Sequence, residues 1–157
     1  MTSQHKALTA TIAALALAIA AAVGGRLWLG SDHSATLTAP LDAACDLQSG
    51  PCASAIPGGG RITLSIAPHP IQLLRPLTIT VTVEGLDAQT VEVDFVGVDM
   101  NMGYNRHPLQ TQGNGQYSGE ATLPVCIIGR MAWQASVIVT SGKTRAVAPF
   151  RFVTRRD

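Results

Sequence analysis

Hydrophobic and polar residues alternate with a period of two along most of the chain after Gly60. The alternation is clearest in residues 77–84, Leu-Thr-Ile-Thr-Val-Thr-Val-Glu, where the four apolar residues share one face of an extended backbone. The other stretches with this alternation contain Ile62, Leu64 and Ile66; Val91, Val93 and Phe95; Tyr117, Ala121 and Leu123; and Met131, Trp133, Ala135, Val137 and Val139. Such stretches predict strands with one buried face and one wet face, as in antiparallel sheets.

Turn residues separate these stretches. Residues 113–115, Gly-Asn-Gly, predict a hairpin that joins a strand over 106–112 to a strand over 116–123. Residues 141–143, Ser-Gly-Lys, predict a second hairpin. No segment after residue 30 has a helical period, so we expect an immunoglobulin-like antiparallel β-sandwich of about seven strands.

The last hydrophobic run changes parity. Val147 has an odd number, whereas Phe150 and Phe152 have even numbers. Because one face of a strand keeps one parity and proline cannot donate a ladder hydrogen bond, Pro149 predicts a bulge or an edge position.

The N-terminal segment is apolar and uncharged between Lys6 and Arg26. It is long enough for a transmembrane helix and longer than the core of a signal peptide, although its alanine-rich composition leaves a cleaved signal as the alternative. The cysteine-bearing, lysine-poor chain beyond it suits an oxidising compartment. We therefore expect residues 1–30 to be a cytoplasmic start and a single-pass transmembrane signal-anchor in the cytoplasmic (inner) membrane, with the domain in the periplasm.

Residues 31–60 are rich in Ser, Thr, Asp, Pro and Gly, which predicts a linker before a domain over 61–157. Within the linker, Cys45 and Cys52 flank a Ser-Gly-Pro turn that favours a local disulfide. The third cysteine is Cys126, and a bridge from either linker cysteine to Cys126 is the alternative.

Composition excludes some classes of function. Charged residues make up only 13% of the chain and the formal net charge is +1, so there is no electrostatic footprint for nucleic acid. The chain has no Gly-x-Ser-x-Gly elbow, no glycine-rich phosphate loop and no His-Glu-x-x-His motif. We expect a protein that is not an enzyme and does not bind nucleic acid.

Soft metal ligands gather in the polar turn of residues 99–108, which contains Met100, Met102 and His107. Thioether sulfur suits Cu(I), and imidazole suits several late transition metals. If successive strands alternate in direction, the loops after the first, third and fifth strands meet at one end. The sequence thus predicts a Cu(I) site whose candidate ligands are Met100, Met102, His107, Cys126, Met131 and His69. In the alternative interpretation the methionines fill the hydrophobic core and His69 is an exposed turn residue.

The layout of one N-terminal span, a linker and a small all-β domain resembles the FixH-like and YtkA-like proteins. The nearest matching segments are residues 99–103, Asp-Met-Asn-Met-Gly, and 130–133, Arg-Met-Ala-Trp, within a resemblance that covers 61–152. It implies an immunoglobulin-like domain that takes part in copper supply or respiratory oxidase assembly. The implied partner is an inner-membrane or periplasmic protein, such as an oxidase subunit or a copper chaperone. The alternative is a non-metal accessory subunit that uses the same loops to bind a membrane protein.

Overall fold

The structure, a computed structural model, describes residues 35–100, 103–124 and 129–155, together with Leu15, Leu17 and Ile19. The chain divides into two compact units, Met1–His33 and Ser34–Asp157. In the first unit, the three described residues are helical and their side chains are exposed. Within the described residues, no helix is long and apolar enough to cross a membrane. The rest of the expected signal-anchor, residues 1–30, lies outside the described residues.

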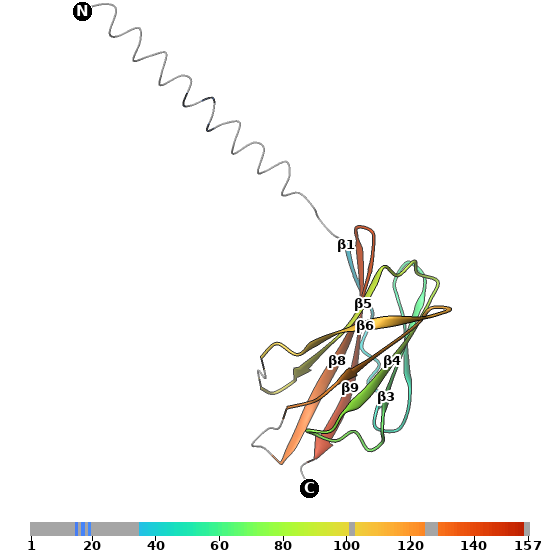
Figure 1. Cartoon of the computed structure of the whole chain (residues 1–157), viewed down its shortest axis with the longest axis vertical. Coiled ribbons are helices and arrows are strands. Elements are labelled where there is room, and N and C mark those ends of the chain that lie inside the picture. The colour runs from blue at the N-terminus through green and yellow to red at the C-terminus, as the bar shows by residue number, and fades with distance from the viewer. Residues whose placement is uncertain are drawn as a thin grey trace, which may run out of the picture. The chain divides into compact units, whose positions relative to one another are not determined.

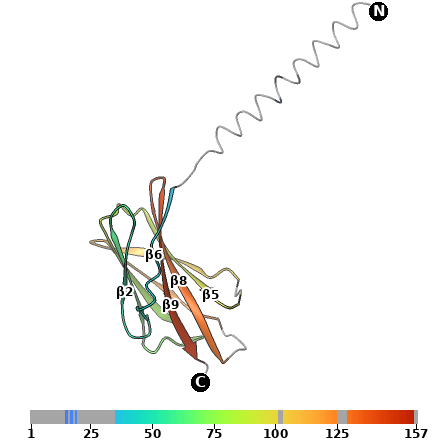
Figure 2. The same ribbon diagram turned by 180° about the vertical axis from the view of Figure 1, so that it is seen from behind.

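The second unit is built from strands alone in its described parts (Figures 1 and 2), which confirms the all-β prediction. Its strands are β1 (Ala35–Thr38), β2 (Cys52–Ala55), β3 (Arg61–Ala67), β4 (Leu77–Glu84), β5 (Thr90–Gly97), β6 (Arg106–Gly113), β7 (Gln116–Ala121), β8 (Arg130–Ser141) and β9 (Thr144–Arg155). They form one curled mixed sheet in the order β1-β9-β8-β5-β6-β7-β4-β3-β2. β6 joins its two halves, because its first residues pair with β5 and its last residues pair with β7.

Both halves of the sheet bury their apolar faces in one hydrophobic cluster. The burial alternates along the strands as the sequence predicts, and Trp133 is completely buried. The Trp133 Nε1–H donates a hydrogen bond of 2.9 Å to Oγ1 of Thr154, which is itself buried. The cluster includes Ile62, Leu64, Ile66, Leu77, Ile79, Val81, Val93, Phe95, Trp133, Val137 and Phe152. The curl therefore supplies the second layer that each strand needs to remove its apolar face from water.

The segment expected to be a linker instead adds two edge strands, which raises the number of strands from about seven to nine. β2 pairs antiparallel with β3, whereas β1 pairs parallel with β9. The sheet is therefore mixed and not purely antiparallel. β1 is mostly exposed and its four residues contain a single large apolar side chain, Leu37. Such a strand is held by backbone hydrogen bonds at an edge, and its sequence carries little hydrophobic alternation.

Both predicted hairpins are present. β6 ends at Gly113 and β7 begins at Gln116, and Asn114 between them has a φ of 52°. Asparagine is one of the few residues with a side chain that readily adopts this left-handed conformation. The turn between β8 and β9 contains Gly142, with a φ of 56°.

β9 passes through Pro149 without a bulge. The pairing of β8 with β9 is continuous across Ser136 and Pro149. The pairing of β1 with β9 ends at Val147, so Pro149 lies where one side of β9 has no strand partner. The edge position is therefore confirmed, and the predicted bulge was wrong. No bulge is needed, because a proline whose nitrogen faces an unpaired edge removes no hydrogen bond from the ladder.

Candidate functional site

The described parts of the connections after β3, β5 and β7 lie toward the same end of the sheet (Figure 1), and the Leu74 N–H donates a hydrogen bond of 3.0 Å to the Leu123 carbonyl between the first and the third. The registers make β3, β5, β7 and β9 run in one direction and β4, β6 and β8 in the opposite direction. We call this end, formed by the described residues 68–76, 98–100, 103–105, 122–124 and 129, the loop end. It lies opposite the start of β1 at Ala35, which pairs with Thr144 beside the β8–β9 hairpin. The alternation of strand direction thus gathers the three connections as expected.

His107 lies on the core side of β6. It stands opposite Val93 of β5, which is fully buried, and directly opposed residues share a face. Its ring packs edge-on against Phe95, with 6.1 Å between the ring centroids. Nε2 lies 2.6 Å from Oδ1 of Asn105. An amide oxygen only accepts hydrogen bonds, so in this contact Nε2 is the donor and the bond fixes the orientation of the ring.

Met131 occupies the first inward-facing position of β8 and is only 4% exposed. It lies two positions before Trp133, which pairs with Gly97, whereas His107 pairs with Val93. Continued by two residues past the end of β5, this register puts Met131 opposite position 99, six positions from Val93, so Met131 and His107 are about 20 Å apart along the strand direction at about 3.3 Å per residue. A single ion with ligand bonds of about 2–2.5 Å cannot bind both side chains.

Of the other expected ligands, His69 is exposed between two prolines that both follow cis peptide bonds. Its neighbour Pro70 lines the same hollow as Arg130, so His69 lies near the start of β8. Met100 is half-buried and packs against the hydrophobic cluster. Met102 and Cys126 lie outside the described residues. Among the residues that are described, no three His, Cys, Asp or Glu side chains are close enough to hold a metal ion.

An ion-pair network on the outer face of β5 and β6 was not predicted. Arg106 contacts Asp94 at 3.1 Å and Glu92 at 3.9 Å, and its guanidinium lies over the Tyr104 ring at 5.7 Å. The hydrogen bond to Asp94 raises the pKa of Arg106, while burial acts in the opposite direction. Beside this network, a shallow hollow of about 450 Å³ is lined by Asp94, Asp99 and Tyr104, among others. The network fixes the base of the connection that carries Met100.

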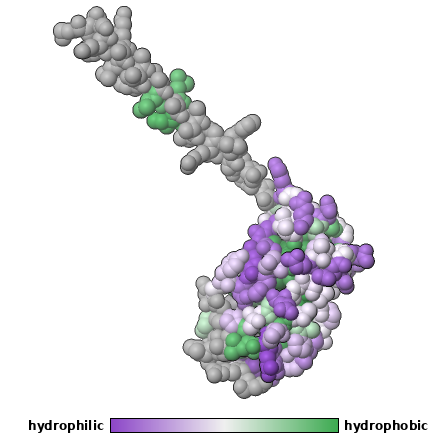
Figure 3. All heavy atoms as spheres, in the orientation of Figure 1, coloured by the Kyte–Doolittle hydropathy of each residue, from purple (hydrophilic) through white to green (hydrophobic). Residues whose placement is uncertain are grey.

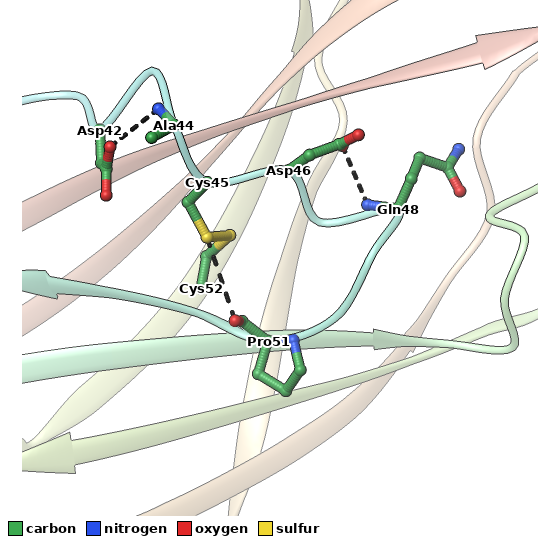
Figure 4. Close-up of a disulfide and its surroundings, with 7 residues drawn as sticks. All are labelled: Asp42, Ala44, Cys45, Asp46, Gln48, Pro51 and Cys52. Atoms are coloured by element: carbon green, nitrogen blue, oxygen red, sulfur yellow. Dashed lines mark hydrogen bonds between the residues drawn. A yellow bond between two sulfur atoms is a disulfide. The ribbon is translucent and has the colours of Figure 1, made fainter.

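The disulfide between Cys45 and Cys52 is present and closes the turn before β2 (Figure 4), which confirms the local pairing. Within this turn, Asp46 Oδ1 accepts a hydrogen bond of 3.0 Å from the backbone N–H of Gln48. The Gln48 side chain was not recognised as important in the sequence. Its Nε2 donates to the carbonyls of Ile71 at 3.2 Å and Val153 at 2.8 Å, and its Oε1 accepts from the Ile71 N–H at 2.8 Å.

These three bonds tie the disulfide-closed turn to the connection after β3 and to the end of β9. The disulfide, Gln48 and the outer network therefore stabilise the loop end from several sides. No family model, no curated protein and no solved structure matches the chain.

Proposed function

We propose that this protein is a membrane-anchored periplasmic protein whose immunoglobulin-like β-sandwich binds Cu(I) at the loop end and delivers it to a partner in oxidase assembly. The observation that supports the proposal is that three connections lie at the same end of the sheet, and that the soft ligands belong to these connections or are next to them in the sequence. Among these connections, residues 68–76, 98–105 and 122–129, the only acidic residue is Asp99. A site with sulfur donors and few carboxylates favours Cu(I) over harder cations.

The proposed ligands are Met100, Met102, Cys126 and Met131, with His69 as a further neighbour. Met100 and the described residues that flank Met102 and Cys126 belong to the loop end, where β8 begins one residue before Met131. His107 is excluded from this set because of its offset from Met131 along β5.

The test is a titration of the full-length protein, purified in a mild detergent without oxygen, against Cu(I) in competition with a chromophoric chelator. We expect one tightly bound Cu(I) per chain. The double variant Met100→Leu/Met102→Leu should fold normally, because this exchange nearly conserves volume, and should bind Cu(I) at least tenfold more weakly. His107→Gln and His33→Ala are the controls, because neither histidine belongs to the proposed ligand set and His33 lies outside the three connections in the sequence, and both should retain the wild-type affinity.

Wild-type binding no tighter than that of a free thiol would contradict the proposal. Unchanged affinity in both Met100→Leu/Met102→Leu and Cys126→Ser would do the same. If His107→Gln lost affinity for Cu(I) while circular dichroism showed an intact fold, the proposed ligand set would be wrong, although the protein would still be a Cu(I) binder.

A second candidate function, an accessory module that binds a membrane protein, is favoured by the exposed hydrophobic residues. In the described part of the β unit, the large hydrophobic side chains that are exposed are Leu74, Val96, Val98 and Tyr104, with exposed fractions of 63%, 41%, 40% and 83%. All four lie at or beside the loop end, and Figure 3 shows hydrophobic residues at the surface near that end. Tyr104→Ser should then abolish copurification of the partner and leave the Cu(I) affinity unchanged.

A further inference from the structure

A hollow of about 460 Å³ opens at the loop end beside the terminal residues of β9. Its lining includes Asp46, Gln48, Pro70, Arg130 and Arg155. The volume lies within the range of small-ligand sites, which is about 300–1,000 Å³. Of the proposed Cu(I) ligands, the described ones, Met100, Met131 and His69, are not among its lining residues.

Two arginines lie side by side in the lining of this hollow. Arg130 of β8 and Arg155 of β9 are paired positions in the ladder, so their side chains leave the same face of the sheet. Both are exposed, and neither makes an ion pair with any described residue. Directly opposed like charges repel, and the repulsion is relieved when an anion binds between them.

The walls of the hollow are already held in place. Gln48 bonds to Ile71 and to Val153, and so fixes the turn, the connection after β3 and β9 relative to one another. The Cys45–Cys52 disulfide closes the turn from which Gln48 projects. A preorganised site loses less conformational entropy when a ligand binds than a mobile one does.

The charge balance selects the kind of anion. Among the described lining residues, Asp46 contributes one negative charge and the two arginines contribute two positive charges, which leaves a surplus of one positive charge. Such a site suits a monoanion better than a dianion such as phosphate. A guanidinium binds a planar carboxylate through two parallel hydrogen bonds, and the side chains of Pro70 and Val153 offer apolar surface for the attached carbon atoms.

We propose that this hollow binds a single carboxylate group, held by Arg130 and Arg155. The carboxylate belongs either to a small organic acid or to the C-terminus of a peptide. This site is independent of the Cu(I) proposal, because its residues and its ligand are different.

The test uses calorimetric titration of the full-length protein with four probes: propionate, an acetylated trialanine with a free C-terminus, the same peptide with an amidated C-terminus, and inorganic phosphate. We expect the free-acid peptide or propionate to bind, and the amidated peptide to bind at least tenfold more weakly. Equal affinity for propionate and the free-acid peptide indicates a small organic acid, and tighter binding of the peptide indicates a chain terminus.

The double variant Arg130→Gln/Arg155→Gln should lower the affinity for the carboxylate at least tenfold, because it removes both cations from exposed positions without disturbing the core. Arg61→Gln, an exposed arginine at the opposite end of the sheet, is the matched control and should change nothing. Asp46→Asn keeps Oδ1 as the acceptor for the Gln48 N–H and removes the charge, so it should tighten carboxylate binding about threefold.

Three results would overturn the proposal: no binding of any carboxylate at millimolar concentration, equal binding of the amidated peptide, or unchanged binding in the double arginine variant. Phosphate that binds more tightly than either carboxylate would also overturn it, because the charge balance would then have been misjudged.

Discussion

Replacing Gln48 with alanine should destabilise the β unit strongly, although the residue is only partly buried. The side chain spans three segments that are distant in the sequence, since its partners Ile71 and Val153 lie 23 and 105 positions away. Alanine removes all three hydrogen bonds at once and leaves the N–H and carbonyl of Ile71 without their partners. All three partners are backbone groups of Ile71 and Val153, and the alanine side chain has no polar atom that could bond to them.

The magnitude follows from the number of bonds. Each contributes about 0.5–1.5 kcal/mol net, so the loss of three lowers the free energy of unfolding by about 3 kcal/mol. The site is only partly buried, and water therefore satisfies some of the exposed backbone groups, which limits the upper end of this range. For a domain of this size the melting temperature should fall by about 12 °C.

Urea unfolding of wild type and Gln48→Ala measures the difference through the midpoint at an unchanged slope. Gln112→Ala is the matched control, because its side chain is exposed and makes one long bond of 3.4 Å to the carbonyl of Gln110. We expect the control to change stability by less than about 0.5 kcal/mol. A loss below 1 kcal/mol for Gln48→Ala would show that the three bonds do not hold the segments together.

Three further substitutions test other parts of the fold by the same unfolding assay. Removal of the Cys45–Cys52 disulfide, with a sequence separation of 7, should cost about 2.4 kcal/mol by loop-closure entropy, and a change below 0.5 kcal/mol would contradict this. Trp133→Phe should cost about 2–3 kcal/mol, because it leaves the buried Thr154 hydroxyl without its donor; a near-neutral result would mean that the hydroxyl finds another partner. Gly115→Ala should destabilise by more than about 1 kcal/mol, because its Cβ would lie 2.5 Å from a backbone oxygen of β4 and its φ is 74°, and equal stability would refute that clash.

The central strands could be predicted because burial on one face imposes an alternation that survives in the sequence. Leu77, Ile79 and Val81 are fully buried while the threonines between them face outward or are half-buried, as a period of two requires. The hairpin at Asn114 could be predicted for a local reason, since few residues tolerate its backbone conformation. The disulfide followed from a turn between two cysteines that are close in sequence.

The edge strands could not be predicted, because their sequence carries no such constraint. β1 contributes one large apolar residue, and its position depends on a free edge of β9 more than 100 residues away. Gln48 was missed for the same reason: an isolated glutamine in a polar segment gives no signal, and its role arises only when distant backbone groups converge on it.

The candidate metal site could be predicted to the level of an end of the sheet and no further. Alternating strand direction brings the three connections together whatever the register. The separation of His107 from Met131 depends on which residues of β5 each strand pairs with, and hydrophobic alternation specifies parity but not the pairing itself. A shift of two residues keeps every apolar side chain inside and moves a candidate ligand by about 7 Å.

The start of β8 separates the two proposed sites, because adjacent residues of a strand face opposite sides. Arg130 points outward to the hollow, and Met131, the next residue, points into the core. Arg130→Gln should therefore weaken carboxylate binding and leave the Cu(I) affinity within about twofold of wild type. Met131→Leu should do the reverse, with little loss of stability since the volume is nearly conserved. If either substitution weakens the binding of both carboxylate and Cu(I) while circular dichroism shows an intact fold, the two ligands share one site. The assignment of Arg130 and Met131 to separate faces would then be wrong.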